Sequence, residues 1–496
     1  MNNTPSQDNL FGHPKGLFLL FTTELWERFS YYAMRAILVL YLVDQVSSKG
    51  GSGFGWTMTD ALSLYGTFTM LVYLTPLIGG WLADNFLGQR KSIYIGGALM
   101  AAGQFILGTP HAWVPGMEIE VFYVGLGLLI AGNGLFKPNI STMVGDLYPE
   151  GDHRRDGAFT IFYMGINIGA FLSGIIVGEV IKYYGTDGNN YYQAGFICAG
   201  LGMIASLVIQ FIYAEKLLGP IGKEPAAKVD KRNATTERKE PLTKVERDRL
   251  KVIIVLGLFT IVFWAGFEQA GGLMNLFTNE FTDRTIPSLG WEVPTTYFQS
   301  LNALFIVIFA PVIASIWIRL GDREPNSPVK FAIGLVFLGI GFIFMMGAVW
   351  QMEGDPTNKS SMLWLVGAYF FHTMGELCIS PIGLSMVTKL APLRIASLMM
   401  GFWFGFIGLA NFVGGLVGSL IGAGGAKEEQ LANAMGIFIG IAVVAAASGV
   451  VLYFMADKLV DWMHGAEDSI HHDTEAQKIA EEIAVTGEHE GIATKS

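Results

Sequence analysis

Residues 16–43 read GLFLLFTTELWERFSYYAMRAILVLYLV, an apolar run of membrane-spanning length that carries four ionisable residues. A transmembrane helix needs roughly 20 apolar residues, and ionisable side chains inside a membrane are costly and usually functional. Three further apolar windows are interrupted by charge, namely 116–138, 252–279 and 360–388. Eight others carry no charge, namely 61–83, 92–117, 157–178, 188–214, 293–318, 331–352, 395–426 and 430–456. The twelve windows predict an all-α integral membrane protein with twelve transmembrane helices.

The composition argues against other classes of protein. Of the 496 residues, 52% are hydrophobic and 15% are charged, whereas soluble domains carry about 25% charged residues. The net charge of −10 argues against a nucleic-acid partner. Cys198 and Cys378 lie in apolar runs, and His471 and His472 lie together in the tail, where we expect no metal site. Because the sequence has no nucleophile–base motif and no phosphate-binding loop, it predicts neither an enzyme nor a cofactor.

The positive charges predict the topology. With the N-terminus placed in the cytoplasm, 24 of the 32 Lys and Arg residues fall in cytoplasmic segments. Five fall in external loops, and three lie within predicted helices. This bias follows the positive-inside rule, so we expect a multi-pass protein with both termini in the cytoplasm. The plasma membrane, in a bacterium the inner membrane, is the expected location.

A break in composition divides the chain into two halves. Residues 215–251 are polar, highly charged and contain three prolines, as is typical of a linker. We interpret them as a cytoplasmic connection between two pseudo-symmetric six-helix halves, residues 1–214 and 252–456. Residues 457–496 form an acidic tail, with ten Asp or Glu residues against three Lys.

The buried charges fall on equivalent helices of this arrangement. The first predicted helix carries four of them, the fourth ends with Lys137, the seventh carries Glu268 and the tenth carries Glu376. These helices are the first members of four three-helix repeats, and transporters built from such repeats place their substrate site at the repeat interface. The pattern therefore predicts one central polar cavity. The alternative is a set of unrelated ion pairs between helices.

Within the first helix, Glu24, Glu27 and Arg28 are spaced i, i+3 and i+4, so they share one face. Arg35 follows two turns later. Two carboxylates beside one arginine cannot both ionise freely at low dielectric, so one of them is expected to bind and release a proton. A structural ion pair would be the alternative, although it would need only one carboxylate.

The predicted cavity is bipolar. Arg35 and Lys137 belong to the first half, whereas Glu268 and Glu376 belong to the second. A ligand with a carboxylate at one end and an amino group at the other would fit this field. Aromatic and amide residues within the predicted helices are further candidates for its lining: Tyr31, Tyr32, Tyr73, Tyr163, Trp264, Tyr297, Trp403, Asn167 and Asn302.

The loop after the second helix contains Gly80, Asp84, Gly88 and Arg90 in a GxxxDxxxGxR pattern. It resembles the signature loop of the major facilitator superfamily. An ion pair between Asp84 and Arg90 could latch a cytoplasmic gate. A weaker copy of the pattern, residues 319–323, lies at the equivalent place in the second half and supports duplication.

Several motifs, in order along the chain, resemble those of the proton-coupled oligopeptide transporter family. Residues 24–32, ELWERFSYY, are similar to its ExxERFxYY motif, and residues 162–169, FYMGINIG, to its FYxxINxG signature. Residues 375–381, GELCISP, are similar to its GELxxSP element. The resemblance implies a proton-driven symporter that imports di- and tripeptides by alternating access. It also implies the major facilitator fold, in a lipid bilayer and with no cofactor beyond the proton gradient.

The resemblance also implies roles for individual residues. Glu24, Glu27 and Arg28 would couple proton binding to transport. Arg35 with Glu268 would close the outer gate, and Lys137 with Glu376 the inner one. The remaining roles concern the peptide: Arg35 and Lys137 for its carboxylate; Glu376, Asn167 and Asn302 for its amino group; Tyr31, Tyr32, Tyr73, Tyr163 and Trp264 for its side chains; and Ser380 beside the inner gate.

Two alternatives stay open at the level of the sequence. The same fold could carry another small solute, such as a peptide-like drug, a glucoside or nitrate, although Glu268 and Glu376 disfavour an inorganic anion. A membrane sensor that binds peptides without transporting them is the alternative from a different class. His372, one turn before Glu376, could tune that carboxylate or serve only in packing. The sequence predicts no oligomeric state.

Overall fold

The computed structural model describes residues 9–45, 52–149, 152, 154–186, 189–226, 241–392, 395–422 and 425–466. Most of the acidic tail, with His471 and His472, lies outside these residues. The long helices of the first half are α1 Lys15–Val43, α2 Met58–Leu82, α3 Gln89–Leu107, α4 Glu118–Asp146, α5 Arg154–Tyr183 and α6 Tyr192–Leu218. Those of the second half are α8 Lys244–Phe267, α9 Leu273–Phe281, α10 Leu301–Leu320, α11 Ser327–Gln351, α12 Met362–Leu390, α13 Ala396–Ser419 and α14 Lys427–Met463.

The number of helices that could span a membrane agrees with the prediction. Among the described residues, ten helical stretches are long and apolar enough to cross a bilayer, with α8 and α9 counted as one. The helices α1 and α3, of 29 and 19 residues, are also of spanning length. The protein is therefore a twelve-helix multi-pass membrane protein.

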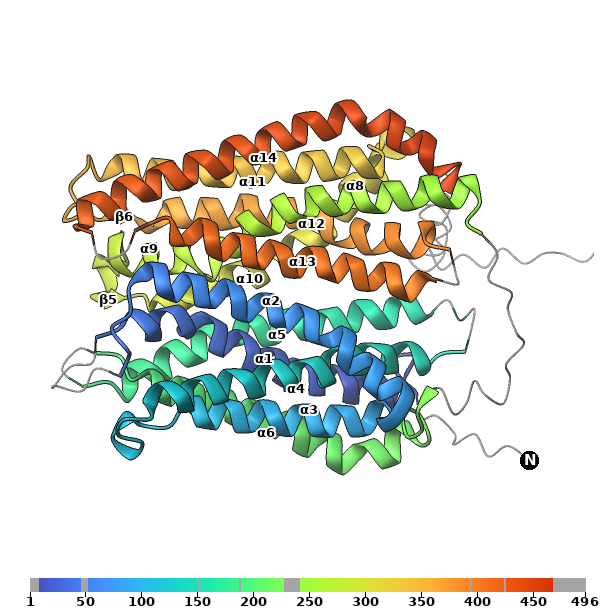
Figure 1. The fold of residues 1–496 in the computed structure, drawn as a ribbon, viewed down its shortest axis with the longest axis horizontal. Coiled ribbons are helices and arrows are strands. Elements are labelled where there is room, and N and C mark those ends of the chain that lie inside the picture. The colour runs from blue at the N-terminus through green and yellow to red at the C-terminus, as the bar shows by residue number, and fades with distance from the viewer. Residues whose placement is uncertain are drawn as a thin grey trace, which may run out of the picture.

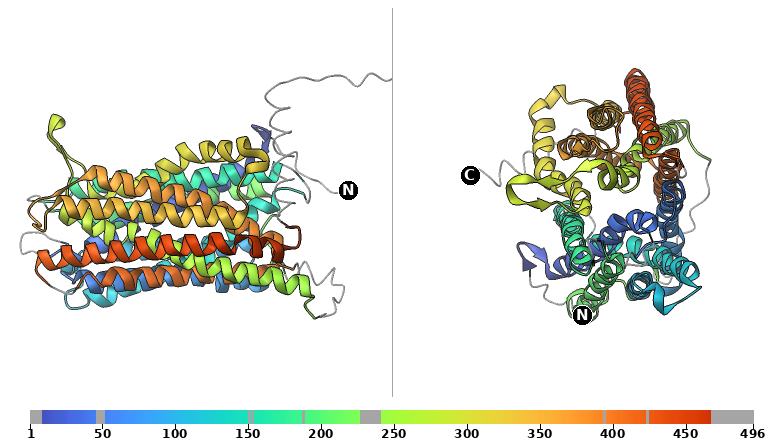
Figure 2. Two further views of the ribbon diagram at one scale, coloured as in Figure 1. Left: turned by 90° about the horizontal axis from the view of Figure 1, so that it is seen from above. Right: turned by 90° about the vertical axis from the view of Figure 1, so that its left-hand side faces the viewer.

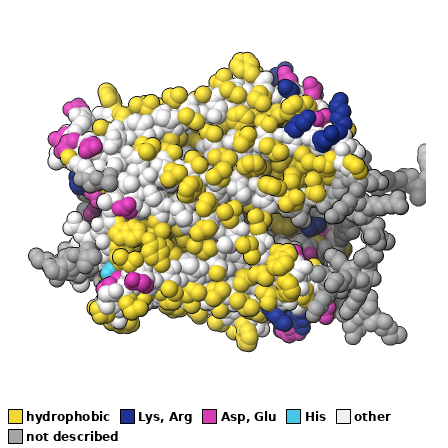
Figure 3. Space-filling view, in the orientation of Figure 1, with side chains coloured by type: hydrophobic (Ala, Val, Ile, Leu, Met, Phe, Trp, Pro, Cys, Tyr) yellow, Lys and Arg dark blue, Asp and Glu magenta, His cyan; other side chains and the backbone are white. Residues whose placement is uncertain are grey.

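The helices run side by side along the long axis in two groups (Figure 1). The helices α1 to α6 form one group and α8 to α14 the other, as the end-on view shows (Figure 2). Hydrophobic side chains cover the middle of the visible face, and Lys and Arg gather mainly at the end where α1 begins and α14 ends (Figure 3). We call this the Lys15 end of the bundle, and the opposite one, where α1 finishes, the Val43 end.

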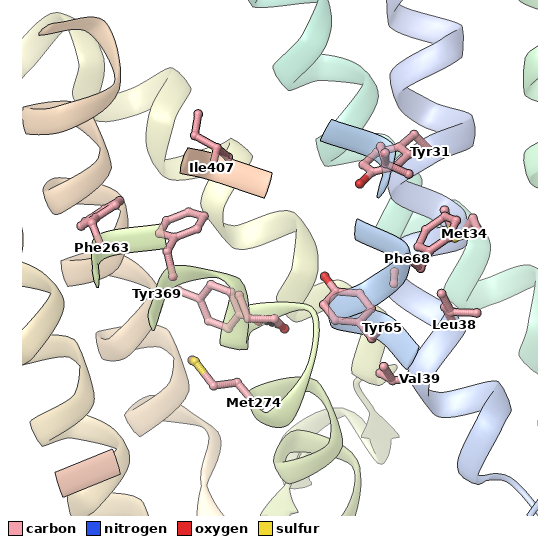
Figure 4. Close-up of a cluster of buried hydrophobic side chains, with 14 of the residues drawn as sticks. Tyr31, Met34, Leu38, Val39, Tyr65, Phe68, Phe263, Met274, Tyr369 and Ile407 are labelled. Atoms are coloured by element: carbon pink, nitrogen blue, oxygen red, sulfur yellow. Dashed lines mark hydrogen bonds between the residues drawn. The ribbon is translucent and has the colours of Figure 1, made fainter. Parts of the chain in front are cut away.

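The two halves meet through equivalent helices. The helix α2 packs against α13, and α5 packs against α10 and the 3-10 helix Thr295–Ser300. Glycines permit the first crossing, because a Cβ on Gly66 would come within 2.7 Å of the Gly415 Cα. Buried residues of both halves join in one hydrophobic cluster. Within it, Tyr65 of α2 and Tyr369 of α12 point toward one another across the interface (Figure 4).

The seventh membrane crossing differs from the continuous helix expected over 252–279. The helix α8 ends at Phe267, a 3-10 turn spans Glu268–Ala270, and α9 starts at Leu273. Two glycines cause the break, since Gly272 adopts φ −105° and ψ −107°, far from helical values. The freed Ala270 carbonyl accepts hydrogen bonds from Gln299 Nε2 at 2.7 Å and Tyr369 Oη at 3.3 Å. Such interruptions are typical of substrate sites in transporters.

Helices also occupy both ends of the predicted linker. The helix α6 continues to Leu218, and α8 begins at Lys244. Thr243 and Glu246 form a reciprocal capping box at the start of α8. The strands are two-residue pairs in loops: β1 Asn9–Leu10 with β2 His13–Pro14, β3 Thr282–Asp283 with β6 Ser360–Ser361, and β4 Thr285–Ile286 with β5 Trp291–Glu292.

Candidate functional site

The three ionisable residues at the centre of α1 form a closed cluster. Arg28 Nε lies 2.8 Å from Glu24 Oε1 and 2.5 Å from Glu27 Oε2. The side chains are at most 5% exposed, and that of Glu27 is completely buried. Glu24 Oε2 and Glu27 Oε1 have no hydrogen-bond partner among the described residues. One arginine thus faces two buried carboxylates, as predicted from the spacing, and a proton on one of them would balance the charge.

Glycines of α5 seal this cluster from the side. A Cβ on Gly169 would collide with the Leu25 carbonyl oxygen of α1, and one on Gly165 would come within 3.0 Å of the Phe21 carbonyl oxygen. The backbones of α1 and α5 therefore touch along the turns that carry Glu24 and Arg28. The glycines of the FYMGINIG motif are explained by this close approach, which removes space for water beside the cluster.

Arg35 and Glu268 join the two halves, as predicted for the outer gate. Arg35 Nη2 donates to Glu268 Oε2 at 2.6 Å, and the two side chains are 12% and 5% exposed. Arg35 Nε donates to Tyr65 Oη at 2.8 Å, and this phenol lies 3.5 Å from Glu268 Oε2. Glu268 sits in the broken segment between α8 and α9, so its carboxylate projects from a turn rather than from a continuous helix.

Glu376 is held by its own half of the molecule. Asn302 Nδ2 of α10 donates to Glu376 Oε2 at 2.7 Å and lies 3.1 Å from Thr373 Oγ1. Glu376 is 9% exposed. Pro381 lies five residues later inside α12 and removes a helical hydrogen bond close to this site. The amide and the carboxylate form a polar pair with spare acceptor capacity, suitable for a ligand ammonium group.

Lys137 lies apart from Glu376 in this conformation. Its Nζ sits 4.5 Å from the centre of the Tyr73 ring of α2, a cation–π contact. Within the described part of the chain, Lys137 forms no ion pair with Glu376 or any other carboxylate. Pro138 interrupts the α4 hydrogen bonding next to it. The outer pair is therefore formed while the predicted inner pair is not.

The predicted aromatic residues divide into two sets. Tyr31 and Tyr32 contact each other edge to face at 5.5 Å and lie beside Arg28 and Arg35, respectively. Tyr163 is 43% exposed, although it lies in the middle of α5. Its carbonyl accepts a hydrogen bond from Asn167 Nδ2 at 3.0 Å.

Other predicted lining residues have packing roles or lie elsewhere. Trp264 contacts Phe267 edge to face, and Trp403 is 3% exposed and packs on Phe331. Tyr297 lies outside the charged centre, in the 3-10 helix at the Val43 end, where its hydroxyl donates to Glu179 at 2.8 Å. Its place in the lining of the cavity stays a prediction.

Ser380 and His372 flank Glu376 along α12. Ser380 Oγ is buried and has no hydrogen-bond partner among the described side chains and backbone. The His372 ring is 1% exposed and lies 4.7 Å from the Phe342 ring. A Cβ on Gly341 would collide with this imidazole. The contacts of His372 are thus apolar packing contacts rather than contacts with Glu376.

Arg90 has partners other than the one predicted for the cytoplasmic latch. Arg90 Nη1 lies 3.2 Å from Glu215 Oε2 of α6, and Nη2 donates to the Gly219 carbonyl at 2.7 Å. Its backbone nitrogen donates to the Gly222 carbonyl at 2.9 Å. Gly88, at φ +79°, turns the chain so that Arg90 faces α6. The residue therefore ties α3 to the end of α6, and the latch role stays a prediction.

Sequence reasoning missed three partners at the outer side of the site. Tyr65 bridges Arg35 and Glu268, and Gln299 and Tyr369 hold the broken segment after Glu268. Gln299 Nε2 also lies 3.0 Å from Tyr369 Oη. No local pattern in the sequence indicated Gln299 or Tyr369, because they lie on other membrane crossings than the break that they hold. No local pattern separates Tyr65 from other helical tyrosines.

Hydrogen bonds between the halves gather at the Val43 end. Asn275 Nδ2 of α9 donates to the Ala36 carbonyl at 2.9 Å, and Thr59 Oγ1 donates to the Ser419 carbonyl at 2.9 Å. Thr296 Oγ1 donates to the Gly174 carbonyl at 2.7 Å. Together with the Arg35–Glu268 pair, these bonds close the interface on this side of the charged centre.

Comparisons with known proteins agree with this architecture. A sequence profile of the POT family matches residues 90–240 and 224–432. A peptide transporter of Yersinia enterocolitica is 34% identical over 508 aligned positions, covering 91% of this chain and 96% of the relative. A di-/tripeptide transporter of Lactococcus lactis subsp. cremoris is 34% identical over 457 positions, covering 81% and 88%. A crystal structure of a peptide transporter POT in complex with sulfate superposes with a TM-score of 0.81 at 35% identity, covering 92% of this chain and 97% of that one.

Proposed function

The chain belongs to the POT family, and on this premise we propose that it is a proton-coupled symporter that imports di- and tripeptides. The proposal includes no enzymatic activity and no cofactor. Among the described residues, no group of three or more His, Cys, Asp or Glu side chains is placed to hold a metal ion. The driving force would be the proton gradient across the membrane.

One observation carries the proposal: the two halves present opposite charges at the same depth of the bundle. Arg35 and Lys137 come from α1 and α4, and Glu268 and Glu376 come from the seventh crossing and α12. A short peptide has a carboxylate at one end and an ammonium group at the other. Its two ends would therefore contact different halves, so binding would depend on how the halves are placed relative to each other.

The orientation follows from the distribution of cations. Arg319 and Lys458 are exposed and Lys389 is half-buried, and all three lie near the ends of helices that finish at the Lys15 end. Under the positive-inside rule this end faces the cytoplasm, and both termini would be cytoplasmic. The Val43 end would face outward, so the structure represents a state closed to the outside. In a bacterium, the membrane would be the inner one.

The proposed cycle uses three groups of contacts in turn. In the outward-open state, Arg35 would leave Glu268, and Lys137 would pair with Glu376 at the inner side. Peptide binding would draw the peptide carboxylate to Arg35 and Lys137 and its amino group to Glu376, Asn302 and Asn167. A proton on Glu24 or Glu27 would release Arg28 from one carboxylate, and the halves would then rock to the state seen here. Tyr31, Tyr32, Tyr73, Tyr163, Trp264 and Ser380 would line the path.

Uptake into liposomes tests this function. Purified protein is reconstituted, a pH gradient with an alkaline lumen is imposed, and the uptake of radiolabelled dialanine is followed. We expect accumulation above the external concentration, which disappears when an ionophore collapses the gradient. Simple equilibration despite a stable gradient would refute proton coupling.

The same assay separates the alternatives. Unlabelled di- and tripeptides should compete with labelled dialanine, whereas nitrate and a glucoside should not. Competition by nitrate or by the glucoside at similar concentrations would assign another cargo. Saturable dialanine binding without any uptake in sealed liposomes would favour a peptide sensor.

A further inference from the structure

A second polar cavity lies between the halves at the Val43 end. It has a volume of about 440 Å³, within the range of about 300–1,000 Å³ that is typical of ligand pockets. The first half contributes Lys182, Asn189 and Asn190, and the second half contributes Asn279, Arg284 and Thr295. The outer end of α5 and the hairpin of β4 and β5 lie side by side in the end-on view (Figure 2).

This cavity is separated from the central charged residues by a closed layer. Leu40 lines it, and Leu40 lies four residues beyond Ala36 on α1, about 6 Å along the helix. The Ala36 carbonyl accepts the Asn275 hydrogen bond, and the adjacent Arg35 is bonded to Glu268. The cavity is therefore outside the gate pair and is distinct from the peptide site described above.

The charges that line the cavity favour the binding of one carboxylate group from a ligand. The Arg284 side chain is 13% exposed, and its two terminal nitrogens bind the Val293 carbonyl at 2.7 Å and Glu292 Oε1 at 2.8 Å. Arg284 Nε is buried and has no hydrogen-bond partner in the described part of the chain. Lys182 adds a second cation, which forms no ion pair with a described residue. Glu292 balances only one of these two cations.

The neighbouring acidic and amide groups support this assignment. Glu280, at the end of α9, lies 2.8 Å from Lys427 Nζ, so its charge is already paired. Asn279 Oδ1 accepts from Thr295 Oγ1 at 3.1 Å, and Asn279 Nδ2 donates to Glu280 Oε1 at 3.4 Å. Asn189 and Asn190 supply further amide groups suited to a peptide bond.

We propose that this cavity is an external peptide site that holds the carboxylate end of a short peptide between Arg284 and Lys182. The proposal rests on the proposed peptide transport. Because residues of both halves form the cavity, it exists only while the Val43 end is closed. A ligand shifts a conformational equilibrium toward the state that it binds better. Peptide bound there therefore stabilises the closed outer end and slows the return to the outward-open state at high external peptide.

Binding measurements on detergent-purified protein test the site. The central site is disabled by the double substitution Lys137→Ala and Glu376→Ala, and dialanine is titrated by calorimetry. We expect residual binding in the millimolar range, about tenfold weaker when Arg284→Gln is added. Alanyl-alaninamide, which lacks the carboxylate, should bind about tenfold more weakly than dialanine to the double variant. Lys182→Gln provides a second variant, because this side chain is exposed and forms no hydrogen bond or ion pair with the described residues.

The control is Lys359→Gln, which removes an exposed lysine at the same end of the bundle but outside the cavity. It should leave the residual binding unchanged. The proposal is overturned if the double variant binds no dialanine up to about 50 mM, or if neither Arg284→Gln nor Lys182→Gln weakens the binding. Failure of the wild-type protein to bind dialanine at all would instead refute the proposed function together with the external peptide site.

Discussion

The buried charges of α1 and those that face each other across the two halves differ in how they are held. Arg28 has both carboxylate partners, Glu24 and Glu27, on its own helix, and the group is sealed by α5. Arg35 and Glu268 come from opposite halves and pair at 2.6 Å in the present structure. In the proposed cycle, the first group stays on one helix and exchanges its proton there, whereas the second pair forms and separates as the halves move. We therefore expect the first group to serve proton coupling and the second to mark the closed state.

The largest effect should come from removing a charge that the peptide itself would contact. Lys137→Ala and Glu376→Ala should each lower dialanine uptake by about a hundredfold, because one end of the peptide loses its buried partner. Exchange should fall as much as uphill uptake does. Initial rates in proteoliposomes measure the effect, and Glu353→Ala, at an exposed loop position, serves as the control. Rates like those of the wild type would show that these charges are incidental.

Substitutions of the two carboxylates on α1 should separate proton coupling from peptide binding. Glu24→Gln or Glu27→Gln should abolish accumulation driven by a pH gradient and leave counterflow exchange. A gradient of about one pH unit supports about tenfold accumulation per proton, so the accumulation ratio should fall by about that factor. Parallel uphill and counterflow assays measure the difference. Intact uphill uptake by both variants would refute the coupling role and with it the contrast between the two groups.

Asn302→Ala tests how the second half presents Glu376. The substitution removes the 2.7 Å hydrogen bond to the carboxylate, which should cost about 1 kcal/mol and raise the KM for dialanine about fivefold. The kcat should change less, because the carboxylate itself remains. Concentration-dependent uptake gives both constants. An unchanged KM would indicate that Thr373 and the backbone position Glu376 without the amide.

Tyr65→Phe should give the smallest effect, and it tests the Arg35–Glu268 pair alone. The phenol oxygen accepts from Arg35 Nε, and its hydroxyl donates to Glu268 Oε2. Loss of the hydroxyl should weaken the closed outer end by about 1 kcal/mol. The outward-open population should then rise a few-fold. Spin labels at the outer ends of α5 and α10 would report this as a longer mean distance. A distance distribution identical to that of the wild type would assign closure to the backbone contacts instead.

The sequence was sufficient for the number of helices and for most of the charged centre. Apolar windows fix the spans by length, and the spacing of Glu24, Glu27 and Arg28 on one helix fixes their mutual geometry. The pairing of Arg35 with Glu268 was implied by the family resemblance alone. The other features depend on local periodicity, which is visible in a single chain.

Other features depend on tertiary packing and could not be predicted. Arg90 binds Glu215 because the chain after α6 folds back over the start of α3, which no local pattern indicates. Tyr297 lies in a 3-10 helix that leads directly into α10, and its hydrogen bond to Glu179 of the other half was not predicted. The break at Gly271 and Gly272 was readable in principle. Its hydrogen-bond partners Gln299 and Tyr369 lie on two other membrane crossings and could not be predicted from the sequence.

Proton movement that accompanies peptide movement tests the central claim most directly. Proteoliposomes carry a pH-sensitive dye in the lumen, no gradient is imposed, and dialanine is added outside. We predict that the lumen acidifies in step with labelled dialanine uptake, and that Glu24→Gln and Glu27→Gln remove the acidification. Dialanine uptake by the wild-type protein without any acidification of the lumen would contradict the account.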